Sequence, residues 1–392
     1  MARQWVGVRG LSQAGDAVWT VALAWTAVHV ASPAAAGAVV AAGTVPRALL
    51  MLVGGVVADR CDPRRVMRLA SAARIVVLVG VAVRVDLGPP SLTVLLVAAV
   101  AFGVSDAAYL PSASTISRQL VRREDLPAYA GMGQTAHRLG DMLGAAGGGL
   151  VVAAWGIGAS AAIDAVTFAV VLAFLAWRLV PRHPLPRAEP EHPLRSVAGA
   201  LAHLRAEPLT RTLVVAMSGL NLFVVPAETV GLALRARGEG WGAGSVGVFL
   251  ALTGLGAAAG SVVLIRRRPR HEARAAFAWL VVQGIAIVAM GLGPWWLTAC
   301  ATFAVGITAG VASVLLGSVF QAVVAGAYLG RMSSLQLLGD DLLMPLATAG
   351  FGALAAAAQP GAAFTAYGAA MVLAVCVPLS KRRVRALRLV EG

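Results

Sequence analysis

The stretch that decides the fold is a short charged turn between two apolar runs, Gly55-Val-Val-Ala-Asp59-Arg60-Cys-Asp-Pro63-Arg64-Arg65. The apolar runs on either side of it cover residues 34–57 and 69–86. A helix needs about 17 to 25 mostly apolar residues to cross a hydrocarbon layer roughly 30 Å thick, and both runs have this length. The pattern therefore predicts two membrane-spanning helices that are joined by a basic turn at the membrane surface.

Similar apolar runs fill most of the chain. Of its 392 residues, 59% are hydrophobic and only 13% are charged, with a mean hydropathy of +0.80, whereas about a quarter of the residues in a soluble domain are charged. This composition excludes a soluble enzyme and predicts an all-α polytopic membrane protein. We expect about 12 transmembrane helices, at residues 8–30, 34–57, 69–86, 90–117, 129–153, 157–179, 211–234, 242–265, 275–293, 295–324, 332–357 and 361–380.

Basic residues gather on one side of the predicted membrane. That side holds clusters at Arg3/Arg9, Arg60/Arg64/Arg65/Arg68, Arg118/Arg122/Arg123, Arg178 to Arg211, Arg266 to Arg274, Arg331 and Lys381 to Arg388. The opposite side has only Arg84, Arg235 and Arg237 near its turns. Because short cytoplasmic loops carry the excess of basic residues, we expect a bacterial cell (inner) membrane protein, multi-pass, with both termini cytoplasmic. This placement also accounts for the net charge of +14 without a nucleic-acid partner.

A polar stretch at residues 181–210 divides the chain. It contains six prolines and charges of both signs, which is typical of a linker, so we expect an N-terminal six-helix bundle at 1–180, a C-terminal one at 211–380 and a basic cytoplasmic tail at 381–392. Leu139-Gly140-Asp141 recurs 199 residues later as Leu338-Gly339-Asp340. Such repetition predicts two pseudo-symmetric bundles, the usual build of secondary transporters.

The turn at residues 55–65 resembles the signature motif of the major facilitator superfamily. Gly55 lets two helices approach closely, Asp59 can cap a helix, and Arg60, Arg64 and Arg65 can form charge pairs at the membrane surface. The resemblance implies a loop that latches the two halves in the outward-facing state, with a partner at Gly330 and Arg331. The alternative is a basic turn that only sets the topology.

Small residues recur along the predicted helix 129–153. Their pattern is similar to the antiporter motif of exporters in this superfamily, and it comprises Gly131, Arg138, Gly140, Asp141, Gly144, Gly148 and Gly149. Small residues at these spacings form a groove for a facing helix. Ala145 stands where the family motif has proline, so the resemblance implies the groove without the proline bend. Plain close packing is the alternative.

Further stretches resemble the drug-export branch that includes macrolide-efflux proteins and enterobactin exporters. They are Ser12-Gln-Ala-Gly15-Asp16, Tyr109-Leu110-Pro111, Arg122-Arg123-Glu124-Asp125-Leu126 and Ile163-Asp164-Ala165-Val-Thr-Phe168. Together with the first motif they span nearly the whole chain. The resemblance implies the major facilitator fold, alternating access and export of a small molecule.

Several ionisable residues fall inside the predicted helices, where each costs about 2.5 to 3.5 kcal/mol and normally has a task. Asp16, Asp106 and Glu228 are our candidates for proton coupling, the first two because no basic residue lies within one helical turn of either. Alternatively, Asp16 and Asp106 hold neighbouring helices together or pair with Arg47 or Arg138. We expect Asp164 and Asp340, which lie near a helix end or in the repeat, to be structural.

Aromatic and amide side chains within the helices are candidates for contacts to a large amphipathic substrate. They are Trp19, Trp25, Phe223, Gln283, Phe320 and Gln321, with core packing or lipid contact as the alternative. The sequence contains no catalytic, phosphate-binding or dinucleotide motif, and its histidines and three cysteines lack metal-ligand spacing. We therefore expect no enzymatic activity, no cofactor and no metal.

These patterns favour a monomeric secondary active transporter in the lipid bilayer. It would export a hydrophobic or amphipathic small molecule, such as a drug or natural product, by proton antiport and alternating access. Two alternatives stay open: a dedicated siderophore or metabolite exporter, and a membrane receptor of the same fold that does not transport.

Overall fold

The structure is a computed structural model that describes residues 1–180, 202–266, 269, 271–324 and 326–381. Within these ranges, the side chains at 51–60, 118, 123, 127, 265, 266, 326, 327, 329–331, 334 and 337 are not described. The described residues are helical almost throughout, which confirms the predicted all-α fold.

The chain forms two compact units. The described part of the first consists of residues 1–180 and 236–251, and that of the second consists of residues 202–235 and 252–381. These units differ from the predicted halves by the placement of residues 236–251. The halves at 1–180 and 211–380 stay a prediction about how the protein is divided into bundles.

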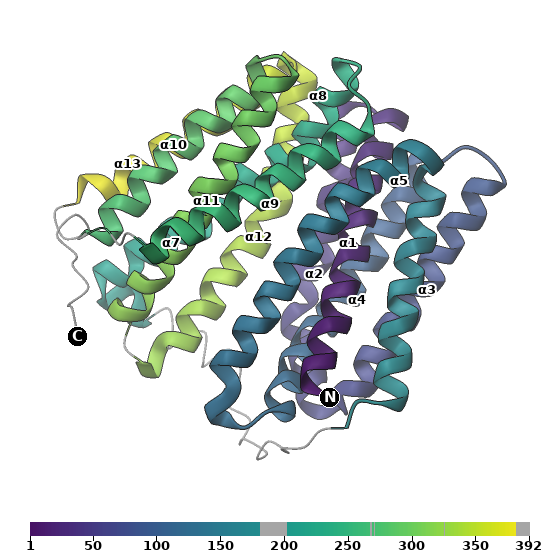
Figure 1. The fold of residues 1–392 in the computed structure, drawn as a ribbon, viewed down its shortest axis with the longest axis horizontal. Helices are drawn as coiled ribbons and strands as arrows, with labels where there is room; N and C mark the ends of the chain where they lie inside the picture. The colour runs from purple at the N-terminus through teal and green to yellow at the C-terminus, as the bar shows by residue number, and fades with distance from the viewer. Residues whose placement is uncertain (181–201, 267–268, 270, 325, 382–392) are drawn as a thin grey trace. The chain divides into compact units, whose positions relative to one another are not determined.

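Long helices build the first unit, and Figure 1 shows their order. They are α1 (Ala2–Val30), α2 (Pro33–Arg60), α3 (Pro63–Asp86), α4 (Leu92–Leu120), the short 3₁₀ turn η1 (Arg123–Asp125) and α5 (Leu126–Trp177). α1 packs along α5, α2 packs along α4, and α3 lies against both α4 and α5. The helices of this unit therefore interleave instead of stacking in chain order.

α5 is two helices joined at Gly156. This glycine has φ 74° and ψ −174°, a conformation that residues with a Cβ rarely adopt and glycine tolerates. The break separates the two spans predicted at 129–153 and 157–179. On its N-terminal side the helix continues past Ala145 without a break, as the missing proline implies.

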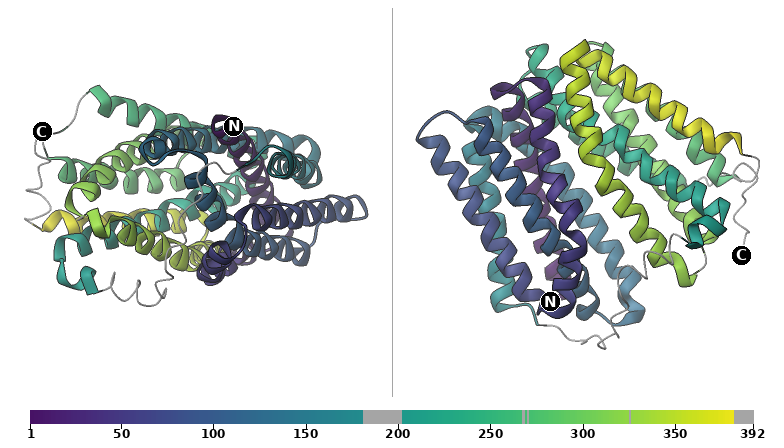
Figure 2. Two further views of the ribbon diagram at one scale, coloured as in Figure 1. Left: turned by 90° about the horizontal axis from the view of Figure 1, so that it is seen from below. Right: turned by 180° about the vertical axis from the view of Figure 1, so that it is seen from behind.

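The second unit contains α7 (Pro208–Pro226), the π-helix η2 (Ala227–Gly231), α10 (Glu272–Leu292), α11 (Trp295–Val323), α12 (Gly326–Ala358) and α13 (Pro360–Ser380). α8 (Leu232–Gly238) and α9 (Ala243–Arg266) contribute residues to both units. α10 packs against α11 and α13, and α12 packs against α7 and α13. Figure 2 shows the ribbon from two further sides.

Ten of the described helices are long and apolar enough to cross a membrane. One of them, Ala128–Trp177, is the broken helix α5 and provides two spans. α1 is outside the ten because Gln13, Asp16 and His29 lower its mean hydropathy, but its 29 residues have the length of a span. Counting α1 and both parts of α5 gives the predicted twelve.

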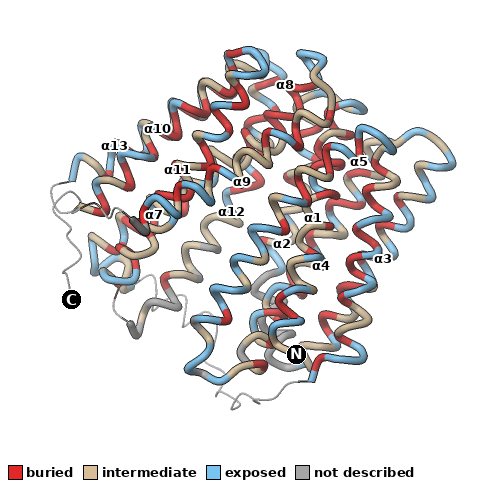
Figure 3. Tube along the Cα trace, in the orientation of Figure 1, coloured by how far each residue is buried: buried red, intermediate tan, exposed pale blue. Residues whose placement is uncertain are grey.

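Large apolar side chains are exposed along many of these helices, where Figure 3 shows the exposed stretches in pale blue. Leu69 is 73% exposed, Val76 71% and Trp177 83%. In water such surfaces promote aggregation, whereas in a bilayer they face acyl chains. The exposed faces therefore fit a membrane environment.

The side chain of Asp62 caps the start of α3. It accepts a hydrogen bond from the backbone nitrogen of Arg64 at 2.9 Å, and Pro63 takes the first helical position, a combination typical of helix N-termini. Burial acts to raise the pKa of Asp62. Hydrogen bonds from Arg64 and the charges of Arg64 and Arg65 outweigh this effect and hold the pKa below its ordinary value.

We expect Asp62→Ala to lower the unfolding free energy by about 1 kcal/mol, because it removes the cap. Asp62→Asn is the matched control, since asparagine keeps the cap and removes only the charge. A lowered folded-state pKa means that the charge adds stability above pH 3.8, the ordinary value, and that this gain is lost as the pH falls through the lowered pKa. Thermal unfolding in detergent at several pH values measures both effects. Equal stability of the alanine and asparagine variants would contradict the capping role.

Candidate proton-coupling and substrate sites

Asp106, on α4, forms an ion pair with Arg74 of α3. Arg74 is 2% exposed, and its guanidinium carbon lies 4.8 Å from the centre of the Phe168 ring and 4.9 Å from that of Tyr109. Aromatic faces and a carboxylate together compensate a buried guanidinium. Asp106 thus pairs with Arg74 instead of Arg47 or Arg138, and its candidate role in proton coupling stays a prediction.

A second carboxylate, Asp164, lies close to this pair in the C-terminal part of α5. It is fully buried, and Thr167 donates a hydrogen bond to its Oδ1 at 3.0 Å. Its Oδ2 has no hydrogen-bond partner among the described residues. α1 approaches it so closely at Gly15 that a side chain there would collide with Asp164 and Thr167.

This approach of α1 brings Asp16 near Asp164 and Arg74, and the three interact through their charges. Asp16 is only partly buried. Sequence reasoning selected Asp16 but assigned Asp164 a structural role. The sequence did contain a signal that links the two aspartates, because Ile163-Asp164 and Gly15-Asp16 both belong to stretches that carry the same family resemblance. The first unit thus gathers three carboxylates around one arginine.

The small residues of α5 form two contact faces. Gly140, Gly144 and Gly148 lie against the backbone of α1, where a Cβ at any of them would collide with it. Gly149 meets Gly247 of α9 in the same way, whereas Gly131 has open space beside it. Three of the motif's glycines therefore form one groove that α1 occupies, and Gly149 belongs to the second face, against α9.

Asp141, from the same motif, is tied to α1 by a hydrogen bond. Gln13 Nε2 donates to Asp141 Oδ1 at 2.6 Å, and His137 Nε2 lies 3.5 Å from Asp141 Oδ2. The side chain of Arg138, three residues before Asp141, is exposed. Asp141 is therefore a link between the two helices at the start of the groove.

The second unit repeats this arrangement. Asn221 of α7 donates from Nδ2 to Asp340 Oδ2 of α12 at 3.0 Å, and Gly339 lies against Ser218 as Gly140 lies against α1. In each unit an amide on the first helix therefore binds the aspartate of the repeated Leu-Gly-Asp sequence. This agreement supports duplication of one ancestral half. The sequence repeat identified the aspartates but not their amide partners.

Glu228 lies in η2, the π-helical segment that begins directly after Pro226. Proline removes a backbone donor and crowds the preceding turn, which favours a local π-helix, and π-helical segments frequently mark functional sites. Thr253 lies near the Glu228 side chain and donates from its hydroxyl to the Thr302 carbonyl at 3.3 Å, while Glu228 Oε1 is buried without a hydrogen-bond partner among the described residues. Gly231, at the end of η2, fits between Phe351 and Phe364, so the packing holds this segment in place.

The predicted latch is described only in part. The side chains of Gly55, Asp59, Arg60, Gly330 and Arg331 lie outside the described residues, so their role stays a prediction. Arg64 Nη2 lies 3.2 Å from Asp62 Oδ2, and Arg64 Nη1 donates to the Leu179 carbonyl at 3.2 Å. Arg65 is exposed. The described contacts of Arg64 thus join α3 to the end of α5 within the first unit.

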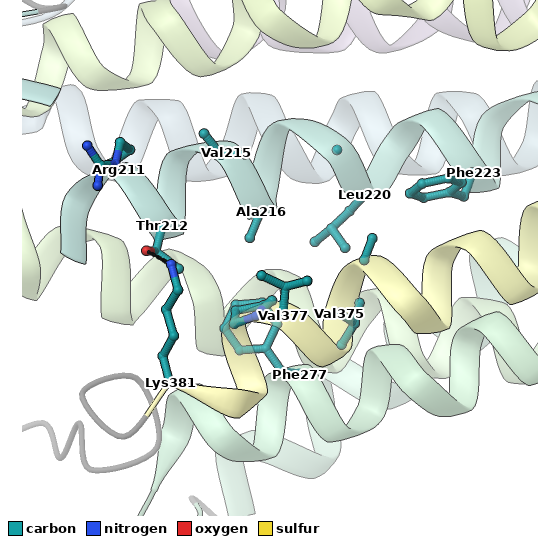
Figure 4. A pocket seen from close by; sticks show the side chains of 13 residues that line it. Arg211, Thr212, Val215, Ala216, Leu220, Phe223, Phe277, Val375, Val377 and Lys381 are labelled. Carbon is teal, nitrogen blue, oxygen red and sulfur yellow. Dashed lines mark hydrogen bonds between the residues drawn. The ribbon is translucent and has the colours of Figure 1, made fainter. Parts of the chain in front are cut away.

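The six candidate substrate residues divide into packed and accessible ones. Trp19 stacks on Phe102, Gln283 donates to the Val305 carbonyl, and Phe320 belongs to a buried cluster with Val214. Trp25 lines a cavity of about 250 Å³ in the first unit, and Gln321 is exposed. Phe223 lines a pocket of about 370 Å³ in the second unit, which Figure 4 shows. Trp25 and Phe223 are therefore the candidates with space beside them.

Ionisable groups inside membrane spans mark solute or ion pathways, and two helical units that each carry such groups define a multi-pass membrane transporter. Residues 7–348 match the Major Facilitator Superfamily. The chain belongs to this superfamily, and it is a secondary transporter of small molecules, not an enzyme. The resemblance of its motifs to this family is confirmed.

Known proteins agree with this assignment over most of the chain. The enterobactin exporters EntS of Shigella boydii and of Escherichia coli O139:H28 are each 29% identical to it over 349 residues, which cover 86% of this chain and 81% of theirs. The nucleoside transporter NupG has a TM-score of 0.76 at 12% identity, with 97% of this chain and 98% of that chain covered. A bacterial homologue of the human lysosomal transporter Spinster has a TM-score of 0.70 at 16% identity, with 98% and 95% covered. The two structures show the fold alone.

Proposed function

We propose that this protein exports a hydrophobic or amphipathic small molecule across the bacterial cell membrane in exchange for protons. The observation that carries the proposal is Glu228, a partly buried carboxylate on a π-helical segment, whose Oε1 is buried and has no hydrogen-bond partner among the described residues. Such a group is costly inside a membrane and is kept where it has a task. Proton binding and release during transport is a task that a carboxylate performs.

Asp16 is the proposed counterpart in the first unit. It lies beside the ion pair of Arg74 and Asp106, so a change in its charge is transmitted to α3 and α4. Asp106 then acts mainly as the charge partner of Arg74. The small-residue groove of α5 supports export, because it is similar to the motif of antiporters. We propose that the protein works as a monomer by alternating access.

An accumulation assay in an efflux-deficient bacterial host tests this proposal. The host carries the wild-type gene, a Glu228→Gln variant at equal membrane abundance, or neither gene. Each host is exposed to a panel of amphipathic dyes and antibiotics. Cells with the wild-type gene should accumulate less of at least one compound than non-expressing cells do, and an uncoupler of the proton gradient should abolish this difference. Equal accumulation of every compound in expressing and non-expressing cells would overturn broad drug export.

A second candidate function is export of one siderophore or related metabolite. The 29% identity to enterobactin exporters over 86% of the chain favours it. Expression in a strain that makes enterobactin but lacks its own exporter should restore secretion into the medium if the substrate is shared. A biosynthetic gene cluster beside the gene would favour this dedicated role over a broad one.

Cys61 tests the proposed orientation, with both termini in the cytoplasm. It is exposed in the turn between α2 and α3, which we place on the cytoplasmic side. In a Cys300→Ser/Cys376→Ser protein, a membrane-impermeant maleimide should label Cys61 in inverted vesicles but not in intact cells. Glu239→Cys in a protein without the native cysteines is the control, because Glu239 is exposed at a turn on the opposite side. The reverse pattern at the two positions would overturn the orientation.

A further inference from the structure

A pocket of about 370 Å³ lies between α7 and α13 in the second unit. In Figure 4, α7 forms one wall with Val215 and Leu220, and α13 forms the other with Val377. Phe277 of α10 also lines it. Val215 is 63% exposed and Val377 58%, so these aliphatic side chains are accessible from outside. The walls therefore suit a hydrocarbon chain.

One end of this pocket is basic. Arg211, in the first turn of α7, and Lys381, directly after α13, lie at the same end, while Phe223 lies at the other (Figure 4). Lys381 Nζ donates to Thr212 Oγ1 at 2.9 Å, which holds the ammonium group at the pocket mouth. Among the described residues no carboxylate forms an ion pair with Arg211 or Lys381. Two cations without an acidic partner fit an anionic group.

The chemistry required of an occupant is therefore a phosphate joined to a hydrocarbon chain. Guanidinium and ammonium groups are the side chains that bind phosphate in proteins. In the proposed orientation the basic end lies at the cytoplasmic surface, where the leaflet carries anionic lipids and where basic pockets between helices bind their headgroups. The pocket thus combines the charge and the apolar length of one class of ligand.

We propose that this pocket binds an anionic phospholipid of the cytoplasmic leaflet. Its phosphate lies between Arg211 and Lys381, and one acyl chain runs along α7 and α13 toward Phe223. The lipid ties the start of α7 to the end of α13, the two ends of the second unit. This binding rests on the proposed orientation for its leaflet, but it does not depend on which substrate is exported.

Lys381 provides the readout, because it is the only lysine in the chain. Full-length protein is placed in nanodiscs of dioleoylphosphatidylcholine with or without dioleoylphosphatidylglycerol, and the rate at which an amine-reactive reagent modifies Lys381 is measured by mass spectrometry. Phosphatidylglycerol should slow the modification, and Arg211→Gln should weaken this protection about five-fold, as expected for one basic residue at a membrane surface. Equal rates in the two lipid mixtures would overturn the proposal.

Gly219→Leu separates pocket binding from general surface attraction. Gly219 lines the pocket, and a side chain added there meets no atom within 4 Å, so leucine fills the space without disturbing the backbone. Protection of Lys381 should then be lost. Gly317→Leu on α11 is the matched control, because it also has open space and is not a lining residue. Protection that survives in Gly219→Leu, or that free glycerol phosphate reproduces, would show that no acyl chain enters the pocket and would overturn the proposal.

Discussion

Asp106→Asn should destabilise the first unit by up to about 3 to 5 kcal/mol, the cost of removing one partner of a fully buried ion pair, since the Asp106 side chain is 29% exposed. Arg74 is 2% exposed, and Asp106 is its ion-pair partner. Without the Asp106 carboxylate, the guanidinium keeps its contacts with the aromatic rings but loses its ion-pair partner, and only the charges of Asp16 and Asp164 remain near it. Thermal unfolding of purified protein in detergent measures the loss, and Asp125→Asn, at an exposed carboxylate, is the control that should change little.

A double variant distinguishes this structural role from a role in proton transfer. Replacing both members of a buried ion pair by uncharged groups is often close to neutral for stability. Arg74→Met places a flexible thioether among Phe102, Tyr109 and Phe168, which favours sulfur–aromatic contacts. Arg74→Met/Asp106→Asn should therefore recover most of the stability lost in Asp106→Asn. An Asp106→Asn variant as stable as the wild type would contradict the ion-pair role.

The helices themselves followed well from hydrophobic runs, because a span is defined by length and apolarity alone. The two parts of α5 illustrate this, since Gly156 separates the runs predicted at 129–153 and 157–179. Helix starts were less accurate. α1 begins at Ala2, not at residue 8, because a helix continues into the polar interface where Arg3 and Arg9 are solvated, and apolarity does not report on that region.

The π-helix at Ala227–Gly231 was not predictable from periodicity. One inserted residue changes the hydrogen-bonding pattern for a single turn, and a run that is apolar on all sides has no stripe to reveal it. Pro226 was the available signal, since proline inside a helix must be accommodated by a kink or bulge. The structure shows that this site also carries Glu228, so the irregular backbone and the intramembrane carboxylate coincide.

Partners of the intramembrane charges were beyond sequence reasoning. Asp106 and Arg74 are on different helices, and so are Gln13 and Asp141, and only the packing of the helices brings each pair together. Asp141 and Asp340 were connected beforehand, because the same three residues recur around them. Arg211 and Lys381, at the mouth of one pocket, carried no such repeat, and their proximity follows from the closure of the second unit.

Glu228→Gln should abolish substrate-driven proton flux in proteoliposomes while leaving counterflow of the substrate in place. Glutamine keeps the size of the side chain and its place near Thr253, but it neither binds nor releases a proton. In this variant a permanently neutral amide replaces the carboxylate whose Oε1 has no hydrogen-bond partner among the described residues. The measurement uses a pH-sensitive dye inside vesicles and a compound that the accumulation assay has identified as a substrate.

Glu124→Gln is the matched control for this experiment, because the same substitution is made at a carboxylate that is 72% exposed and forms only a surface pair with Arg122, and surface pairs contribute little. Its proton flux should equal that of the wild type. Asp16→Asn should reduce the flux as Glu228→Gln does, since we assign the two carboxylates to one coupled exchange. Wild-type flux in both Asp16→Asn and Glu228→Gln, with transport intact, would mean that protons do not pass through these residues, and the coupling ion would then have to bind elsewhere.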